Sequence, residues 1–275
     1  MTIVDAHCHF WRLDRGDYGW LAGADPALDP IRRDVLPKDY PGDARLIVVQ
    51  AAPSVAETEF LLDLARQDSR ICGVVGWVDL AADDARAMLN QLARDPVFRG
   101  VRPMLQDIAA TDWLLDAARP EALRALADAG LCFDALVTER HLPMLREVAA
   151  RHPDLPLVID HAAKPQPGAR DDWATGMQAL ARLPHVQCKL SGLLTEFAPA
   201  ARADPLPALR DIVAPLIDWF GPERLIWGSD WPVLTLAATW ERWRDLTDAL
   251  LADLGLSDHA AIMGGNAARF YGLAP

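Results

Sequence analysis

Short apolar or β-branched runs alternate with longer segments of helical spacing along the whole chain, and there are eight such runs. Their sequences are TIVDAHCHF, RLIVVQAA, CGVVGWVDL, FRGVRPML, LCFDALV, LPLVIDHA, VQCKLSGL and RLIWGSDWP. A strand followed by a helix, repeated along a chain, is typical of a parallel sheet. The runs are nearly continuous in apolar residues, as expected of strands that are covered on both faces. We therefore predict an α/β fold, a closed (β/α)8 TIM barrel, rather than a doubly wound open sheet.

The length of the chain fits a single barrel domain. It has 275 residues, of which 51% are hydrophobic, enough to build a sizeable core. No low-complexity stretch or linker interrupts the sequence, so we expect residues 1–275 to form one domain. Helix ends can also be read: Ser54 and Glu57 form a capping-box pattern before FLLDLA, and Gly221 with the proline after it ends a later helix.

The segment 11–43 is too long for an ordinary loop and too short for a domain. It follows the first run and contains Trp11, Tyr18, Trp20, Pro26, Pro30 and Pro37. Long loops in compact domains are either functional covers or disordered inserts, and aromatic residues favour the packed cover. We predict an elaborated first βα loop that packs over the barrel.

Charge and cysteine content limit the environment and the partners. Asp and Glu number 39 against 27 Lys and Arg, so the net charge is −12 and we expect no nucleic-acid partner. Cysteines stand at positions 8, 72, 132 and 188, far apart and without a C-x-x-C pair, which predicts free thiols in a reducing compartment. No secretory signal or membrane-length apolar segment is present, so we expect a cytoplasmic protein without a membrane partner. A homo-oligomer is left open.

Polar residues gather at the C-terminal ends of the eight runs. In a (β/α)8 barrel the loops after the strands build the site, so polar residues there indicate chemistry. In chain order they are His7, His9, Gln50, Asp79, Arg102, Gln106, Asp134, Asp160, His161, Lys189, Ser191 and Asp230. Buried ionisable groups are tolerated when they are paired, bound to a metal or hydrated in a pocket. We expect these residues to converge at one mouth, and not the histidines elsewhere, His141, His152, His185 and His259.

Each of these residues, taken alone, also has a purely structural interpretation. The H-x-H pair of the first run lies on one face of a strand, where a histidine is often only hydrogen-bonded in the core. Asp230 is also a suitable N-cap for the helix that follows it. Arg102 and Lys189 could each form a buried ion pair, with Asp134 as the alternative partner.

Nine motifs, taken together, carry a family likeness: DAHCHFW, VQAAPSVAET, GVVGWVDL, GVRPMLQD, FDALV, VIDHAAKP, CKLSGLLTE, IWGSDWPV and GGNAARFYGL. They resemble the amidohydrolase-related family of the amidohydrolase superfamily, in its sugar-lactonase group, and the likeness runs from end to end. It implies a (β/α)8 carboxylic-ester hydrolase in carbohydrate catabolism that opens lactones of the L-fucono- or L-rhamnono-lactone type. Relatives open muconolactone-type and pyrone dicarboxylate rings, and neighbouring branches include zinc-dependent decarboxylases.

The resemblance also implies roles for individual residues. The metal ligands it implies, for one divalent ion such as Zn²⁺, are His7, His9 and Asp230. The strand-six histidine is His161, and Arg102 orients the substrate. Binuclear members carry a carboxylated lysine on strand four and a histidine on strand five, where this chain has Arg102 and Asp134, so we expect no two-metal site. Some lactonase relatives work without metal, which leaves metal-independent catalysis open.

Opening of a lactone requires an activated water, stabilisation of the oxyanion and a proton for the ring alkoxide. We expect Asp230 to take the proton from water and return it to the alkoxide, while His161 polarises the carbonyl. Sugars present hydroxyls and apolar C–H faces, and the side chains expected to bind them are Lys189, Gln50, Gln106, Trp11 and Trp231. The rival functions are a zinc-dependent decarboxylase and a non-catalytic binder, and the retained buried charge argues against the binder.

Overall fold

Eight parallel strands form the centre of the computed structural model, which describes residues 2–166, 168 and 170–274. They are β1 (Val4–Cys8), β2 (Arg45–Val49), β3 (Ile71–Gly76), β4 (Phe98–Val101), β5 (Cys132–Ala135), β6 (Leu157–Ile159), β7 (Val186–Leu190) and β8 (Leu225–Trp227). Their order in the sheet is their order in the chain. The backbone N–H of His9 donates to Trp231 at 2.8 Å and that of Asp230 to His7 at 2.7 Å, which joins the β8 end to β1. The predicted (β/α)8 barrel is confirmed.

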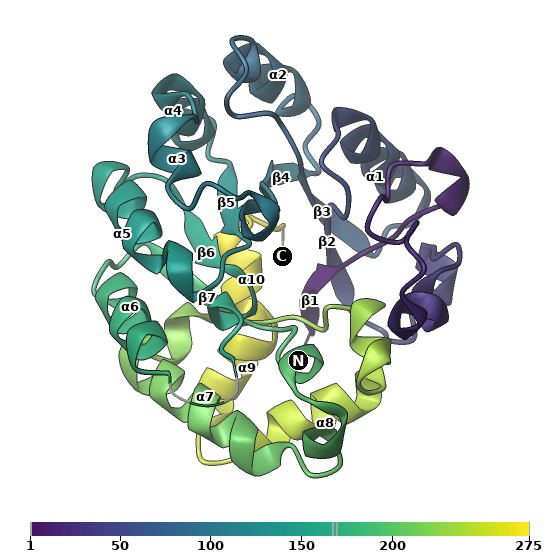
Figure 1. Ribbon diagram of the computed structural model, residues 1–275, viewed down its shortest axis with the longest axis vertical. Helices are drawn as coiled ribbons and strands as arrows, with labels where there is room; N and C mark the ends of the chain where they lie inside the picture. Colours follow the sequence, from purple (N-terminus) through teal and green to yellow (C-terminus); the bar gives the residue numbers. More distant parts are fainter. Residues whose placement is uncertain (1, 167, 169, 275) are drawn as a thin grey trace.

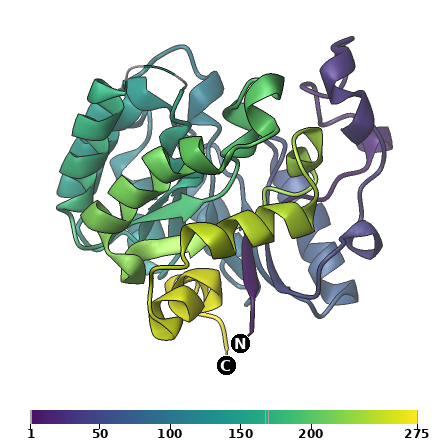
Figure 2. The same cartoon turned by 90° about the horizontal axis from the view of Figure 1, so that it is seen from below.

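Helices follow the strands and surround the barrel (Figure 1). They are α1 (Val55–Gln67), α2 (Ala85–Leu92), α3 (Trp113–Asp116), α4 (Pro120–Asp128), α5 (Leu142–Arg151), α6 (Asp171–Ala181), α7 (Leu206–Phe220), α8 (Trp240–Leu250), α9 (Leu256–Ala260) and α10 (Asn266–Phe270). Single helical turns lie at Leu13–Arg15, Pro26–Ile31, Pro37–Asp39, Leu105–Asp107, Glu139–His141, Asp160–Ala163, Leu194–Glu196, Pro199–Arg202, Pro222–Arg224, Val233–Leu236 and Ala261–Gly265. Figure 2 shows α9 and α10 beside both chain termini, at the end where β1 begins.

The predicted helix ends are found, with one difference. The Ser54 hydroxyl accepts the backbone N–H of Glu57 at 3.0 Å and caps α1, and Gly221, at φ 71°, ends α7. The Glu57 carboxylate does not complete the capping box, because it accepts the backbone N–H groups of Ala51 and Ala52 at 2.9 and 3.1 Å. Glu57 therefore holds the loop after β2, at the mouth of the barrel.

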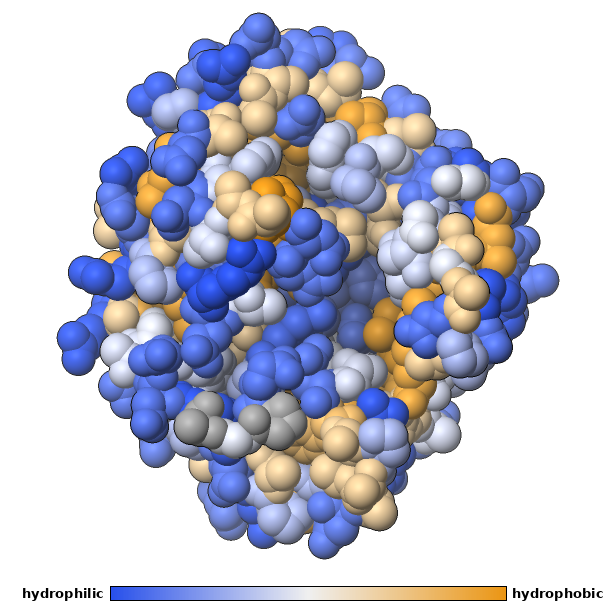
Figure 3. Space-filling view, viewed as in Figure 1, coloured by the Kyte–Doolittle hydropathy of each residue, from blue (hydrophilic) through white to orange (hydrophobic). Residues whose placement is uncertain are grey.

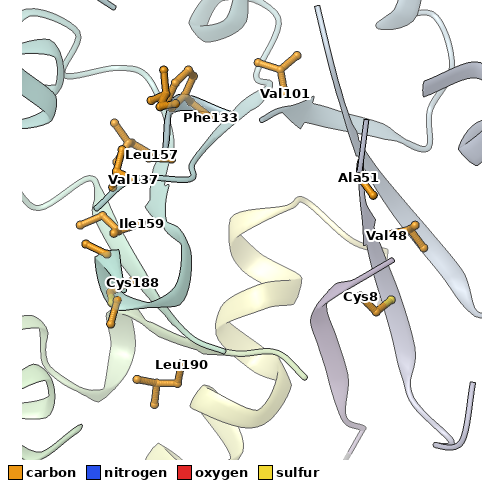
Figure 4. Close-up of a cluster of buried hydrophobic side chains, with 14 of the residues drawn as sticks. Cys8, Val48, Ala51, Val101, Phe133, Val137, Leu157, Ile159, Cys188 and Leu190 are labelled. Carbon is orange, nitrogen blue, oxygen red and sulfur yellow. The ribbon is translucent and has the colours of Figure 1, made fainter. Parts of the chain in front are cut away.

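Alternation along the strands separates two apolar layers. In β2, Leu46 and Val48 belong to the large core under the helices, whereas Ile47 and Val49 belong to a smaller cluster with Tyr271, which follows α10. Figure 4 shows members of the outer layer, such as Leu157 on β6. Burial of such a side chain contributes about 1.5–3 kcal/mol relative to exposure. The C-terminal helices thus close the floor of the barrel and leave the other end for a site.

The segment 11–43 packs over the mouth side of the barrel, as predicted. Its backbone pairs with itself at Trp11 and Val35, and Trp11, Tyr18 and Ile31 are buried. The indole N–H of Trp20 donates to the carbonyl of Ala51 at 2.9 Å, which ties this segment to the loop after β2. We call residues 11–43 the cover loop.

Two further expectations concern the cysteines and the membrane. The four thiols are free, as predicted, and that of Cys72 is only partly buried. In the described part of the chain, no helix combines the length and apolar character that a membrane crossing needs.

Candidate active site

A hydrophilic hollow lies at the centre of the barrel mouth (Figure 3). It contains a cavity of about 250 Å³. The residues that line this cavity are His9, Trp20, Ala51, Arg102, Met104, Gln106, Asp107, Leu136, His161, Lys164, Asp230 and Val233. They come from the ends of several strands and from the cover loop, which is the arrangement expected of a site in this fold. We call it the active-site cavity.

The Asp230 carboxylate lies among three imidazoles at the floor of the active-site cavity. Its Oδ1 is 3.2 Å from Nε2 of His9, 3.7 Å from Nε2 of His7 and 4.0 Å from Nε2 of His161. These residues are buried and come from the ends of β1, β6 and β8. The structure therefore brings together the two histidines of the H-x-H pair, the strand-six histidine and the strand-eight aspartate.

Partners on the far side of each ring fix its orientation. His9 Nδ1 is 2.7 Å from the carbonyl oxygen of Val49, which only accepts, so Nδ1 carries a hydrogen and Nε2 is directed toward Asp230. The ring of His161 has Nδ1 at 2.9 Å from the Ser191 hydroxyl. His7 turns Nδ1 toward the floor of the barrel, 3.3 Å from Asp160. All three Nε2 atoms thus face Asp230.

The backbone that carries His161 is unusual. Residues 161–164 have positive φ values between 49° and 59°, so the chain makes a left-handed turn with four non-glycine residues. Such conformations cost free energy and cluster at functional sites. Gly192, at φ 63°, leaves room for the His161 ring, because a Cβ there would lie 2.4 Å from its Nδ1.

Asp5 holds the loop that presents Asp230. Its carboxylate accepts the backbone N–H of Ser229 at 2.8 Å and the Tyr40 hydroxyl at 2.7 Å, and it also binds the Ser229 hydroxyl. Tyr40 belongs to the cover loop, so one buried carboxylate joins β1, the loop after β8 and the cover loop. The analysis of the sequence did not single out Asp5, although it precedes the H-x-H pair.

Electrostatics keep Asp230 ionised and favour the neutral form of His7 and His161. Burial raises the pKa of Asp230, but the nearby imidazoles, His161 first, outweigh burial and hold it below its ordinary value. Burial lowers the pKa of His161 to about 4. Burial, followed by the charge of Lys189, lowers the pKa of His7 well below its usual range. At neutral pH the Asp230 carboxylate is therefore ionised, and the imidazoles of His7 and His161 are neutral.

Lys189 is fully buried beneath the cluster and does not line the active-site cavity. Its Nζ lies 2.5 Å from Asp134, 3.0 Å from Asp160 and 3.1 Å from Nδ1 of His7. Tyr271, from the C-terminal end, donates to Asp134 at 2.8 Å. Lys189 therefore forms the buried ion pair with Asp134 that the sequence left as an alternative. The expected contact of Lys189 with substrate is not found, because the ammonium points into the barrel floor.

Three other residues expected to bind substrate also lie outside the cavity lining. The Gln50 side chain is buried and donates to the carbonyl of Arg102 at 2.6 Å, and the Trp11 indole donates to the carbonyl of Arg33 at 2.8 Å. Trp231 is buried against Phe10 and Tyr40. These three residues lie near the mouth, as the sequence predicted. Their polar groups and rings, however, contact other protein groups and do not face the cavity, so the predicted contacts with substrate are not found.

Arg102 and Gln106 do line the cavity, as expected. Arg102 binds the Gln50 carbonyl, and its Nη1 is 3.5 Å from Nε2 of His7. The sequence analysis missed Trp20 and Lys164, which also line the cavity. Lys164 follows His161 in the left-handed turn, and its Nζ lies 3.6 Å from Glu196. Trp20 lies in the stretch DYGWL, residues 17–21, and Lys164 lies in the VIDHAAKP motif, so these two stretches could have pointed to them.

The donor set of the cluster fits one divalent metal ion. The ligand atoms of His7, His9 and Asp230 lie within 4.8 Å of one another. Zinc bonds of about 2.0–2.2 Å in a tetrahedral site space the ligand atoms by roughly 3.4 Å, close to the observed 3.2 and 3.7 Å. Two imidazoles and one carboxylate are a ligand set that zinc accepts, with room for water in the remaining position.

Comparisons with known proteins place the whole chain in one family. Residues 4–273 match the amidohydrolase family. The sequence is 45% identical, over 98% of this chain and 94% of the relative, to L-fucono-1,5-lactonase of Burkholderia ambifaria, and 37% identical, over 98% and 96%, to L-fucono-1,5-lactonase of Burkholderia multivorans. Among solved structures, an amidohydrolase from Burkholderia multivorans with bound zinc is 37% identical, with a TM-score of 0.89 over the full length of both chains.

Proposed function

Because the chain belongs to the amidohydrolase family, we propose that it is an enzyme that hydrolyses the ring ester of a sugar-acid lactone, of the L-fucono- or L-rhamnono-lactone type. The observation that carries the proposal is the position of Asp230 among three imidazoles on the floor of a cavity at the barrel mouth. The names of the two curated relatives support a lactone as the substrate. The cavity of about 250 Å³ lies close to the lower end of the range of ligand sites.

Substrate binding falls to the polar residues on the cavity wall. Arg102 and Lys164 present cationic donors and Gln106 an amide, which suit carbonyl and hydroxyl oxygens. Trp20, 37% exposed at the rim, offers an indole to an apolar C–H face of a sugar ring. Together they orient the lactone with its carbonyl toward the cluster.

His7, His9 and Asp230 would hold the metal ion. When bound there, a zinc ion supplies Lewis-acid polarisation and lowers the pKa of water. The ring orientation of His9 supports this role, because Nδ1 donates to Val49 and Nε2 is the nitrogen directed toward Asp230. On the far side of His7, Nδ1 lies 3.1 Å from the Lys189 ammonium and 3.3 Å from Asp160, and these two groups fix the orientation of the ring.

The protein's own groups account for the movement of protons. Asp230, ionised, accepts a proton from the water whose oxygen attacks the carbonyl carbon. In the tautomer in which the Ser191 hydroxyl, 2.9 Å away, donates to Nδ1 of His161, Nε2 carries a hydrogen that can bond the carbonyl oxygen as it gains negative charge. The ring C–O bond then breaks, and Asp230 returns its proton to the departing alkoxide. The product is the open hydroxy acid, whose carboxyl group releases one proton to the solution.

That released proton provides the test of the function. We expect the purified enzyme to hydrolyse at least one member of a panel of five- and six-membered sugar lactones, followed with a pH indicator against the spontaneous rate. Muconolactone and pyrone dicarboxylate complete the panel. If no lactone is hydrolysed, the proposal is wrong, and release of CO₂ from aromatic or unsaturated acids would then indicate a decarboxylase.

Removal of metal tests the ligand assignment. We expect chelation, verified by elemental analysis, to lower kcat/KM by about 100-fold or more, because Lewis-acid activation of water is worth several kcal/mol. Stoichiometric zinc should restore the activity of the wild type but not of a His7→Ala, His9→Ala double variant. Full activity in protein shown to be free of metal would contradict the assignment.

A further inference from the structure

A second and larger cavity, of about 450 Å³, lies beside the active-site cavity and has no role in the proposed reaction. Its walls come from the cover loop, the loops after β2, β3 and β4, and α3. Trp20, Met104 and Asp107 line both cavities, so the two are neighbours along one shared wall at the mouth. A group attached to a substrate in the first cavity would enter the second past these three side chains.

Three indoles give the second cavity its apolar character. Trp20 comes from the cover loop, Trp77 directly follows β3 and Trp113 begins α3. All three are partly exposed in the free protein. Indole rings bind apolar C–H faces, such as those of a sugar ring, over a large rigid area. Because the three rings come from separate segments and line the same cavity, together they form an aromatic wall, whereas one buried tryptophan would only fill space in the core.

Three carboxylates lie among these indoles. Asp17, Asp79 and Asp107 line the cavity, and no lysine or arginine is among the described residues that do so. Carboxylates accept hydrogen bonds from hydroxyl groups and repel anions. The Asp17 carboxylate is paired with Arg15 at 2.5 Å, so the negative charge that faces the cavity comes mainly from Asp79 and Asp107. An aromatic or aliphatic acid would be disfavoured beside them, whereas a neutral group with several hydroxyls would satisfy both the indoles and the carboxylates.

We propose that the second cavity is a subsite for a neutral sugar unit linked to the lactone ring, so that the enzyme acts on glycosylated sugar lactones as well as on single-ring ones. The proposal rests on the proposed lactone hydrolysis and names a wider substrate class for it. The linked sugar stays attached through the same hydroxyl oxygen of the lactone throughout, and only the C–O bond between the carbonyl carbon and the ring oxygen is broken. Its binding energy would raise kcat/KM.

The test compares single-ring and two-ring lactones. The best single-ring lactone of the panel is compared with derivatives that carry a glucosyl or galactosyl group on each ring hydroxyl in turn. We expect at least one derivative to exceed its parent in kcat/KM by about tenfold or more, the ratio that a stacking contact of about 1.4 kcal/mol supplies. If every derivative is equal to its parent or worse, the subsite is absent while lactone hydrolysis still stands. If no lactone at all is hydrolysed, both proposals fail.

Variants locate the effect in the second cavity. Trp77 lines only this cavity, so Trp77→Ala should abolish the advantage of the two-ring substrate and leave the single-ring rate within about twofold. Trp219→Ala, at a partly buried tryptophan outside both cavities, is the matched control. An equal loss on both substrates in Trp77→Ala would overturn the proposal.

A change of charge gives a second, milder variant. The Asp79 carboxylate accepts the backbone N–H of Ala81 at 3.0 Å, a contact that asparagine retains, so Asp79→Asn should fold normally. It should weaken the two-ring advantage severalfold, because a neutral amide is a poorer acceptor for hydroxyls. A glucosaminyl derivative that outperforms the glucosyl one would instead indicate a cation site and overturn the proposal.

Discussion

The Asp230→Asn variant is expected to lose about 10³-fold or more in kcat on the best lactone. Removal of a positioned general base costs 10²–10⁴-fold, and here the same carboxylate also serves as acid for the leaving alkoxide and as a metal ligand. The asparagine amide is nearly isosteric and retains an oxygen toward His9, which lies 3.2 Å away, so the fold should be preserved. Initial rates of proton release measure the loss.

Two controls separate the roles of Asp230. Asp83→Asn, at a side chain that is 93% exposed, should keep wild-type rates. Assay of Asp230→Asn at saturating zinc, with the bound metal measured, distinguishes a ligand from a base. If added zinc restores the turnover of Asp230→Asn, the carboxylate is a metal ligand and not the base. If the variant turns over normally without added zinc, the carboxylate has neither role.

Local sequence patterns predicted the barrel because each strand and helix carries its own signal. The run RLIVVQAA predicts β2, and Ser54 fixes the start of α1 through a contact only three residues along the chain. The mouth could be predicted for the same reason, since the topology of a parallel barrel brings all strand C-termini to one end. The identities of His7, His9 and Asp230 as neighbours followed from that topology.

What the sequence could not show is the direction of individual side chains beyond the strand ends. Lys189 and Asp134 lie at inward positions of β7 and β5, but whether an inward side chain reaches the mouth or the floor depends on the stagger of the strands. Trp11 was expected to face the substrate and instead packs within the cover loop, whose path no local pattern specifies. The left-handed turn after β6, which carries Lys164 to the cavity, contains no glycine, the residue that usually indicates positive φ in a sequence.

The Lys189→Met variant should have the largest effect on stability. Methionine fills much the same volume but leaves Asp134 and Asp160 buried without the cation that now lies 2.5 and 3.0 Å from them. Breaking a buried ion pair by removal of one partner costs about 3–5 kcal/mol, which for a chain of this size corresponds to a fall in Tm of roughly 6–20 °C. Urea unfolding followed by circular dichroism measures the loss of free energy.

The origin of that loss can be tested by removing the stranded charge as well. A Lys189→Met, Asp134→Leu double variant should regain part of the stability, because replacement of a whole buried pair by apolar groups is often neutral. Full recovery is not expected, since Asp160 stays buried with His7 at 3.3 Å as its remaining partner in the described part of the chain, and Tyr271 loses the acceptor that it contacts at 2.8 Å. Lys38→Met, at an exposed lysine, is the matched control and should unfold as the wild type does. If Lys189→Met also unfolds within about 1 kcal/mol of the wild type, below the range for a broken buried pair, the lysine does not hold the two carboxylates together, and its proximity to His7 would have to serve the active site alone.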